Sequence, residues 1–425
     1  MKKLLAFIFA GLSAIPLAAR DFDSCFDNRT LRLDYTFSGT NKQQLLFLDQ
    51  LSSFSGWAGP RHNLDSLPLR GYGQILMCDA ERGDTLYRKS FATLFQEWQG
   101  TEEATRVAKS FENSFLVPYP KKKVNITVSL FNNRGEVSSL MTHSVDPKDI
   151  LIRNLDGVAV TPHRFIRQNG PADKCIDVAL VAEGYTQDQM PQFYADCETA
   201  VQSILSHEPF KSQSSKFNFI AVASPSSDSG VSIPGQHIWK HTAVDSHFDT
   251  FYSERYLTTL HVKQLHDLLV GIPYEHLIIL ANTEQYGGGG IYNSYTLTSS
   301  RHAIFRPVVV HEFGHSFAGL ADEYYYDDEF EPMYPAGVEP YEQNITTLTD
   351  FGSKWKDLLP AGTEIPTRPT GSDVYTKIGV YEGGGYQSKG VYRAYQDCRM
   401  KTNEAPVFCP VCVRALDRLI RFYTE

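Results

Sequence analysis

The sequence predicts a multidomain protein in which an N-terminal all-β sandwich is followed by an α/β domain. The chain has 425 residues, more than one compact core usually organises. Between about residues 22 and 155, apolar and polar residues alternate along several segments, which is typical of strands with one buried face. Beyond residue 175, short apolar runs alternate with segments of helical spacing. We therefore expect the sandwich at residues 20–157 and the α/β domain at residues 158–425.

Residues 1–19 have the pattern of a signal peptide that is removed from the mature chain. Lys2 and Lys3 form a basic start, and residues 4–18 are apolar but short for a membrane span. Ala18 and Ala19 supply small residues for cleavage. The alternative is a membrane anchor that stays attached. No later stretch is long and apolar enough to cross a bilayer, so we expect an exported protein (extracellular, periplasmic or on the cell surface) without an integral membrane segment after cleavage.

The β-sandwich is predicted from two runs in which apolar and polar residues take turns. The apolar members of these runs are Leu31, Leu33, Tyr35 and Phe37, and then Val124, Ile126, Val128 and Leu130. Residues 132–135 read Asn-Asn-Arg-Gly and indicate a hairpin turn after the second run. Residues 91–108 are less regular and are expected to hold a short helix.

The α/β domain begins after a break at residues 154–173, where Gly, Pro and Asn are frequent. Nearly continuous apolar runs predict buried strands, and apolar residues spaced three or four apart predict helices. The predicted strands are 176–182, 217–223 and 276–281, and the predicted helices are 188–206 and 257–269.

The segment His311-Glu312-Phe313-Gly314-His315 carries the chemistry. Residues four apart lie on one face of a helix, so His311 and His315 can bind one zinc ion there. Glu312 lies beside the first histidine, where it can act as general base toward a water molecule. Pro307 suits the first helical turn, and Gly319 suits the C-terminal end. We therefore predict one catalytic Zn²⁺ ion, with Glu312 as the catalytic residue.

A catalytic zinc ion needs a third protein ligand and an open position. The metzincin pattern places that ligand six residues after the second histidine, but here the position is Ala321, which has no donor atom. Gly319 likewise lies one place later than the metzincin glycine. The spacing therefore looks like a metzincin with one residue inserted, and it favours Asp322 as the third metal ligand. Glu323 is the second choice and a more distant Glu the third.

The segment from His311 through Asp322, Glu323 and Tyr324 resembles the IgA-peptidase family of bacterial metallopeptidases. The resemblance extends to Arg399-Met400 and to residues 408–412 near the C-terminus, which read Phe-Cys-Pro-Val-Cys. It also covers the layout of signal peptide, β-rich domain and catalytic domain. It implies a metzincin-like zinc peptidase domain and hydrolysis of peptide bonds, without implying that IgA is the substrate. The resemblance also favours Met400 as part of a methionine-containing turn beneath the metal.

The predicted function is that of a secreted zinc-dependent endopeptidase with a protein or peptide substrate. One alternative is a non-enzymatic protein- or glycan-binding adhesion protein on a peptidase-like scaffold. Another is a zinc enzyme that hydrolyses a non-peptide amide. The intact set of His311, Glu312 and His315 favours an enzyme, because a binder has no need of the base. The formal net charge of -9 argues against a general nucleic-acid or anionic-membrane binder.

Two further segments have competing interpretations. Residues 286–291 contain four consecutive glycines, which can form an edge strand that takes up a substrate peptide by strand addition, or a flexible surface loop. Cys409 and Cys412 form a Cys-x-x-Cys pair, and we expect Cys398 to form a disulfide with one of them. A structural zinc site at these cysteines lacks an obvious fourth ligand in the sequence. Since the chain has seven cysteines, at least one thiol stays unpaired within it.

Overall fold

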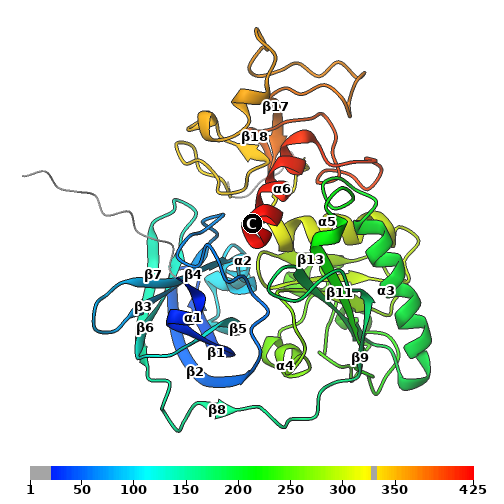
Figure 1. Ribbon diagram of the computed structural model, residues 1–425. Coiled ribbons are helices and arrows are strands. Elements are labelled where there is room, and N and C mark those ends of the chain that lie inside the picture. Colours follow the sequence, from blue (N-terminus) through cyan, green and yellow to red (C-terminus); the bar gives the residue numbers. More distant parts are fainter. Residues whose placement is uncertain (1–20, 327–332) are drawn as a thin grey trace, which may run out of the picture.

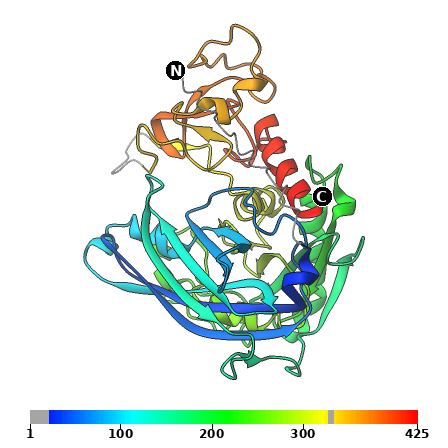
Figure 2. The ribbon, with the colours of Figure 1, turned by 60° about the vertical axis from the view of Figure 1, so that its left-hand side comes forward.

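The computed structural model describes residues 21–326 and 333–425. Three β-rich regions follow one another along the chain: an N-terminal pair of sheets, a larger mixed sheet with helices, and a small sheet near the C-terminus (Figure 1). Viewed from another side, the C-terminal helix lies between the small sheet and the larger mixed sheet (Figure 2). The predicted signal peptide, residues 1–19, lies outside the described residues.

The N-terminal region consists of two four-stranded sheets, with strand orders β5-β1-β2-β8 and β4-β3-β6-β7. Phe37 and Phe115 of the first sheet pack on Phe91 of the second, and the ring centroids of Phe91 and Phe115 are 4.4 Å apart. The two sheets therefore bury their apolar faces against each other, as the alternating pattern predicts. The strands are β1 (Phe26–Thr40), β2 (Gln43–Ser55), β3 (Gly73–Asp79), β4 (Thr85–Phe91), β5 (Lys109–Pro120), β6 (Val124–Phe131), β7 (Val137–Val145) and β8 (Arg153–Asn154).

The predicted hairpin turn and the predicted short helix are both present in this region. The turn at residues 132–135 joins β6 to β7, and Gly135 adopts a positive φ of 77° there. The predicted short helix is α2 (Leu94–Gln99), whose first turn is capped by Thr93 accepting a hydrogen bond from the Gln96 N–H. A short helix, α1 (Phe22–Cys25), precedes β1.

The second region is a six-stranded mixed sheet in the order β13-β14-β12-β10-β11-β9. The four central strands are parallel, and both edge strands run antiparallel to their neighbours. The predicted strands at 176–182, 217–223 and 276–281 are confirmed as three of the central four, and all three are fully buried. The strands are β9 (His163–Arg167), β10 (Ile176–Glu183), β11 (Phe217–Val222), β12 (His276–Ala281), β13 (Gly288–Ile291) and β14 (Tyr295–Ser299).

Helices α3 (Met190–Ile204) and α5 (Phe305–Ala318) contact each other and the six-stranded sheet, whereas α4 (Val262–Asp267) contacts β5 of the sandwich. The predicted helix at 257–269 is therefore too long at its N-terminal end. Thr258 and His247 exchange backbone hydrogen bonds of 3.0 and 3.2 Å, which hold this segment extended. The apolar spacing favours a helix here, but the backbone N–H and C=O groups of Thr258 are hydrogen-bonded to His247 instead.

The third region, a small sheet, was not predicted. Its order is β15-β18-β16, with β17 also paired to β18. Ile345 and Val391 of this sheet share a small apolar cluster with Ala321 and Tyr334. The C-terminal helix α6 follows and contacts α5 and β10. The elements are β15 (Tyr325–Tyr326), β16 (Ile345–Thr346), β17 (Tyr381–Gly384), β18 (Tyr386–Arg393) and α6 (Pro410–Thr424).

One buried apolar cluster runs through both the sandwich and the six-stranded sheet. Direct hydrogen bonds also join them, including one from the Ala92 N–H to Tyr292 O of 2.9 Å. The division at residue 157 stays a prediction. No helix within residues 21–326 and 333–425 has both the length and the apolar character needed to cross a membrane.

Candidate metal centre

Helix α5 carries the histidines, and its sequence explains where it begins and ends. Pro307 is its third residue, where a missing N–H leaves no intrahelical hydrogen bond unmade. Val309 and Val310 are buried in the core. Gly319 ends the helix in the left-handed conformation with φ of 55°, and its N–H returns to His315 O at 2.8 Å. The predicted start and stop signals are confirmed.

The structure brings His311, His315 and Asp322 together. The Nε2 atoms of the two histidines lie 3.0 Å apart, and Asp322 Oδ1 lies 3.0 Å from the first and 3.2 Å from the second. These three atoms therefore form a compact triangle beside the C-terminal half of α5. The bend at Gly319 turns the chain back so that Asp322, three residues later, reaches the imidazoles.

Both imidazoles are oriented by backbone carbonyls on their far side. His311 Nδ1 lies 2.9 Å from Arg399 O, and His315 Nδ1 lies 2.5 Å from Leu320 O. A carbonyl only accepts, so each Nδ1 donates its proton there, and each Nε2 faces Asp322 as the ring atom available to a metal ion. Three acceptor atoms at this separation repel one another unless a cation lies between them.

The residues present fit a zinc ion. Tetrahedral ligands bound at about 2.0–2.1 Å lie roughly 3.3 Å from one another, close to the distances among these three atoms. Two imidazoles and a carboxylate leave a fourth position open, as a catalytic zinc requires. Without a cation, burial lowers the pKa of His315, but the charge and hydrogen bond of Asp322 raise it to about 9. In the absence of a metal ion, a proton on His315 therefore supplies the positive charge beside Asp322.

Asp322 and Glu323 point to different surroundings. Burial opposes ionisation of Asp322, yet His315 and His311 hold its pKa well below the ordinary value. Tyr386, which begins β18, donates a hydrogen bond of 2.5 Å to Asp322 Oδ2. Glu323 Oε1 instead lies 3.0 Å from Asn344 Nδ2 and 3.3 Å from Cys412 Sγ. The geometry thus joins Asp322, and not Glu323, to the two histidines.

Glu312 lies on the side of α5 that faces β13. A Cβ atom added to Gly288 would be 2.9 Å from Glu312 Oε1, so the carboxylate rests against the bare backbone of that strand. Burial raises the pKa of Glu312, while His311 and His315 lower it. A carboxylate whose pKa is raised is a stronger base, which is the property needed to accept a proton from water.

The Gly-rich segment forms an edge strand, β13, as one of the two interpretations expected. A Cβ atom at Gly290 would lie 2.3 Å from Glu312 O and 2.8 Å from His315 Cβ. Only glycine lets the strand approach α5 this closely. Strand β13 pairs with β14 on one side, and on the other a single bridge joins Gly288 to Tyr256.

Met400 packs directly against α5, the helix that carries His311 and His315. Its sulfur lies 2.8 Å from the position of a Cβ at Gly314, and the side chain is fully buried. The same loop supplies Arg399 O to His311, and Met400 O accepts a hydrogen bond of 2.7 Å from the Glu323 N–H. This loop therefore supports α5 and the segment after it.

Two residues near the centre were missed in the sequence. Tyr386 contacts Asp322, but no pattern links positions 64 residues apart. Glu97 belongs to α2 of the sandwich, and Tyr256 donates a hydrogen bond to it. Although part of Glu97 stays open to solvent, loss of water around its carboxylate raises its pKa to about 7; His315 and Asp322 also act on it electrostatically.

The expected disulfide between Cys398 and Cys409 or Cys412 is wrong. All seven cysteines are free, and Cys412 Sγ lies 3.9 Å from Cys398 Sγ and 3.6 Å from Cys409 Sγ. A disulfide requires about 2.0 Å between the sulfur atoms. The three thiols are neighbours, at separations too long for a disulfide bond.

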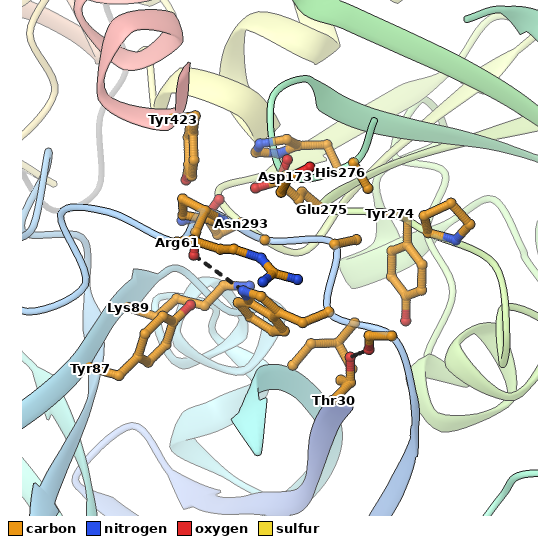
Figure 3. A pocket seen from close by; sticks show the side chains of 18 of the residues that line it. Thr30, Arg61, Tyr87, Lys89, Asp173, Tyr274, Glu275, His276, Asn293 and Tyr423 are labelled. Carbon is orange, nitrogen blue, oxygen red and sulfur yellow. Dashed lines mark hydrogen bonds between the residues drawn. The ribbon is translucent and has the colours of Figure 1, made fainter. Parts of the chain in front are cut away.

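A cavity of about 360 Å³ lies between the sandwich and the six-stranded sheet, and neither His311, His315 nor Asp322 lines it (Figure 3). Lys89 and Glu275 face this cavity from opposite sides. Burial lowers the pKa of Lys89 to about 8, and Glu275 opposes this shift. The cavity is therefore separate from the candidate metal centre.

Two histidines one helical turn apart, a glutamate between them and an acid past a glycine bend are typical of metal-dependent hydrolases. Residues 165–379 and 370–420 match the IgA Peptidase M64 family, and residues 21–142 match the Peptidase M64 N-terminus. The chain belongs to the IgA peptidase M64 family, a family of metallopeptidases, which confirms the resemblance. Its substrates are accordingly proteins or peptides. No curated protein matches the chain.

Proposed function

We propose that this chain is an exported zinc-dependent endopeptidase in which His311, His315 and Asp322 hold one zinc ion and Glu312 is the general base. The observation that carries the proposal is the convergence of two Nε2 atoms and one carboxylate oxygen within 3.0–3.2 Å. The signal-peptide pattern of residues 1–19 supports export. The metzincin-like arrangement is supported by the helix, the glycine bend and buried Met400 beneath α5.

When zinc is bound, it supplies Lewis acidity that activates a water molecule and polarises the peptide carbonyl. Glu312 accepts the proton that the water loses as it attacks the carbonyl carbon. The same carboxyl group then donates that proton to the departing amine, so the peptide bond breaks without a free anion. The bare backbone of β13 beside Glu312 provides an edge along which an extended substrate can pair.

The test is the Glu312→Gln variant, which keeps the shape of the side chain but cannot accept the proton. We expect peptide hydrolysis to fall by about 10²–10⁴-fold with zinc content unchanged. Glu198→Gln is the matched control, because it makes the same change at an exposed position on α3 and should leave activity intact.

Digestion of a peptide library by the wild-type protein separates the alternatives. Cleavage within peptides supports an endopeptidase, whereas cleavage of non-peptide amides alone supports the other zinc enzyme. A protein that binds zinc but hydrolyses neither class of substrate would favour the binding or adhesion alternative. Near-normal turnover in Glu312→Gln would remove Glu312 from the mechanism.

A further inference from the structure

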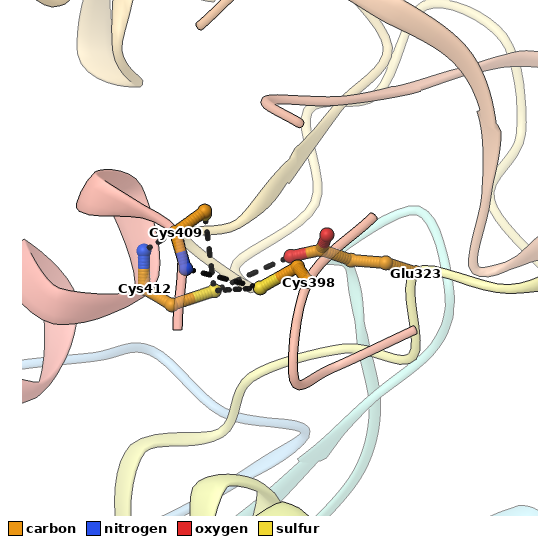
Figure 4. Close-up of side chains that lie close together, drawn as sticks. All are labelled: Glu323, Cys398, Cys409 and Cys412. Carbon is orange, nitrogen blue, oxygen red and sulfur yellow. Dashed lines mark hydrogen bonds between the residues drawn. The ribbon is translucent and has the colours of Figure 1, made fainter. Parts of the chain in front are cut away.

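A second group of metal-ligating side chains lies beside the first, and the proposed peptidase mechanism does not use it. The Sγ atoms of Cys398, Cys409 and Cys412 and a carboxylate oxygen of Glu323 all lie within 4.8 Å of one another (Figure 4). All four residues are buried. They come from three segments: the loop that contains Met400, the start of α6 and the chain just after Asp322.

The separations are those of a tetrahedral metal site. Around zinc, with Zn–S of about 2.3 Å, two sulfur ligands lie roughly 3.8 Å apart and a sulfur and an oxygen roughly 3.5 Å apart. Cys412 Sγ lies 3.9 Å from Cys398 Sγ, 3.6 Å from Cys409 Sγ and 3.3 Å from Glu323 Oε1. These distances are too long for a disulfide and match the edges of such a tetrahedron.

Backbone N–H groups point at the sulfur atoms. The Cys409 N–H donates to Cys398 Sγ at 3.1 Å, and the Cys412 N–H donates to Cys409 Sγ at 3.5 Å. Such bonds favour the thiolate form, which is the form that binds metal. The spacing Cys409-x-x-Cys412 is also that of structural zinc sites.

Glu323 needs a positive partner in this interior. Its side chain is fully buried, and Oε2 has no hydrogen-bond partner among the described residues. A buried carboxylate oxygen that has neither a hydrogen bond nor a directly bound cation is disfavoured. Arg393 and Lys401 interact electrostatically with Glu323, which offsets the negative charge that three thiolates and a carboxylate leave around a divalent cation.

We propose that Cys398, Cys409, Cys412 and Glu323 bind a second, structural zinc ion. Four protein ligands leave no open position, so this site holds the chain and does not react with substrate. Glu323 follows Asp322 directly, and Cys398 precedes Arg399, whose carbonyl orients His311. The second ion thereby fastens α6 to both segments that position the first metal centre.

Cobalt substitution of the full-length chain tests this site, because thiolates give Co²⁺ an intense near-ultraviolet charge-transfer absorption and imidazoles and carboxylates do not. We expect the wild-type protein to show this absorption and to hold about two metal ions per chain. The His311→Ala/His315→Ala variant should keep the absorption and lose about one ion, which separates this site from the proposed catalytic one.

The Cys409→Ser/Cys412→Ser variant should lose the thiolate absorption. Cys78→Ser, a half-buried cysteine of the sandwich, is the matched control and should keep it. If the double serine variant does not fold, the wild-type and double-alanine spectra still decide the matter. Cobalt-loaded wild-type protein without thiolate absorption, or an intact mass showing a disulfide within residues 398–412, would overturn the proposal.

Discussion

At the scale of single residues, two adjacent acids take different roles. The carboxylates of Asp322 and Glu323 contact different groups, so the two acids do not face the same centre. Asp322 reaches the histidines and accepts a hydrogen bond from Tyr386. Glu323 reaches Cys412 and Asn344. In the sequence, the distance from Gly319 favours Asp322 as the metal ligand, but no sequence pattern indicates what Glu323 contacts.

Asp322→Ala should strongly weaken zinc binding at the His311–His315 centre, because it removes the third ligand and leaves two imidazoles. Glu323→Ala should weaken that centre less, since its carboxylate faces the cysteines. Chelator competition on both variants, read by residual peptidase activity, measures the difference at this centre. If Asp322→Ala retained its catalytic zinc like the wild type while Glu323→Ala released it, the assignment of ligands would be reversed.

At the scale of elements, the close packing of β13 on α5 fixes the position of Glu312. Strand β13 approaches near enough that Gly290 has no room for a side chain, and Gly288 leaves space for the Glu312 carboxylate. The four glycines were recognisable in the sequence as a strand or a loop. Which of the two they form depends on local antiparallel pairing with β14 and on contact with α5, which is more distant in sequence.

Gly290→Ala should displace either β13 or α5 and reduce peptide hydrolysis, because the new methyl group would lie 2.3 Å from Glu312 O. Overpacking of this kind costs about 1–3 kcal/mol of the free energy of unfolding. Gly352→Ala is the control, since its nearest neighbour would be 3.7 Å away and its backbone is not left-handed. Equal activity and equal thermal stability in the two variants would show that β13 does not constrain the centre.

The sequence predicted those elements whose apolar residues follow one clear period. Helix α3 and the alternating strands β1 and β6 belong to this group, whereas β10, β11 and β12 were predicted from nearly continuous apolar runs and α5 from the spacing of His311 and His315 with Pro307 and Gly319 at its ends. The small sheet escaped because β15 and β16 have only two residues each, too few for a period. Helix α4 was predicted too long because pairing between Thr258 and His247 overrides the local spacing.

His311, Glu312 and His315 were identifiable because their spacing is local, whereas Tyr386 and Glu97 reach the centre only through tertiary folding.

At the scale of the whole molecule, the sandwich and the six-stranded sheet share buried surface. Arg32 of the sandwich is buried and pairs with Asp34 and with Asp267 of α4. Lys89 of β4 faces Glu275 across the cavity, and the Glu275 N–H donates a hydrogen bond of 2.8 Å to Asp177 O. Because burial shifts the pKa values of charged groups near this junction, the free energy of unfolding depends on pH.

Asp177→Asn should stabilise the protein above pH 6. Burial raises the pKa of Asp177 to about 6, whereas an unfolded chain has the ordinary value of about 4. Between these values the unfolded state gives up its proton first, so the free energy of unfolding falls as pH rises from about 4 to 6. Replacing the carboxyl group should remove this loss, roughly 1–3 kcal/mol.

Denaturant unfolding of the wild type and Asp177→Asn from pH 4 to pH 8 measures the effect. The difference in unfolding free energy should grow with pH through this window and then level off. Asp65→Asn, at an exposed position, is the control and should show no such growth. A difference that is constant across the range would mean that Asp177 does not titrate as burial predicts.

The most direct measurement is anomalous X-ray diffraction from crystals of the active full-length protein, recorded on both sides of the zinc absorption edge. The proposed function predicts a zinc peak bounded by His311 Nε2, His315 Nε2 and the Asp322 carboxylate, the three groups that converge beside α5. An active, zinc-containing protein with no peak at that position, or with Glu323 in place of Asp322 beside it, would contradict the account.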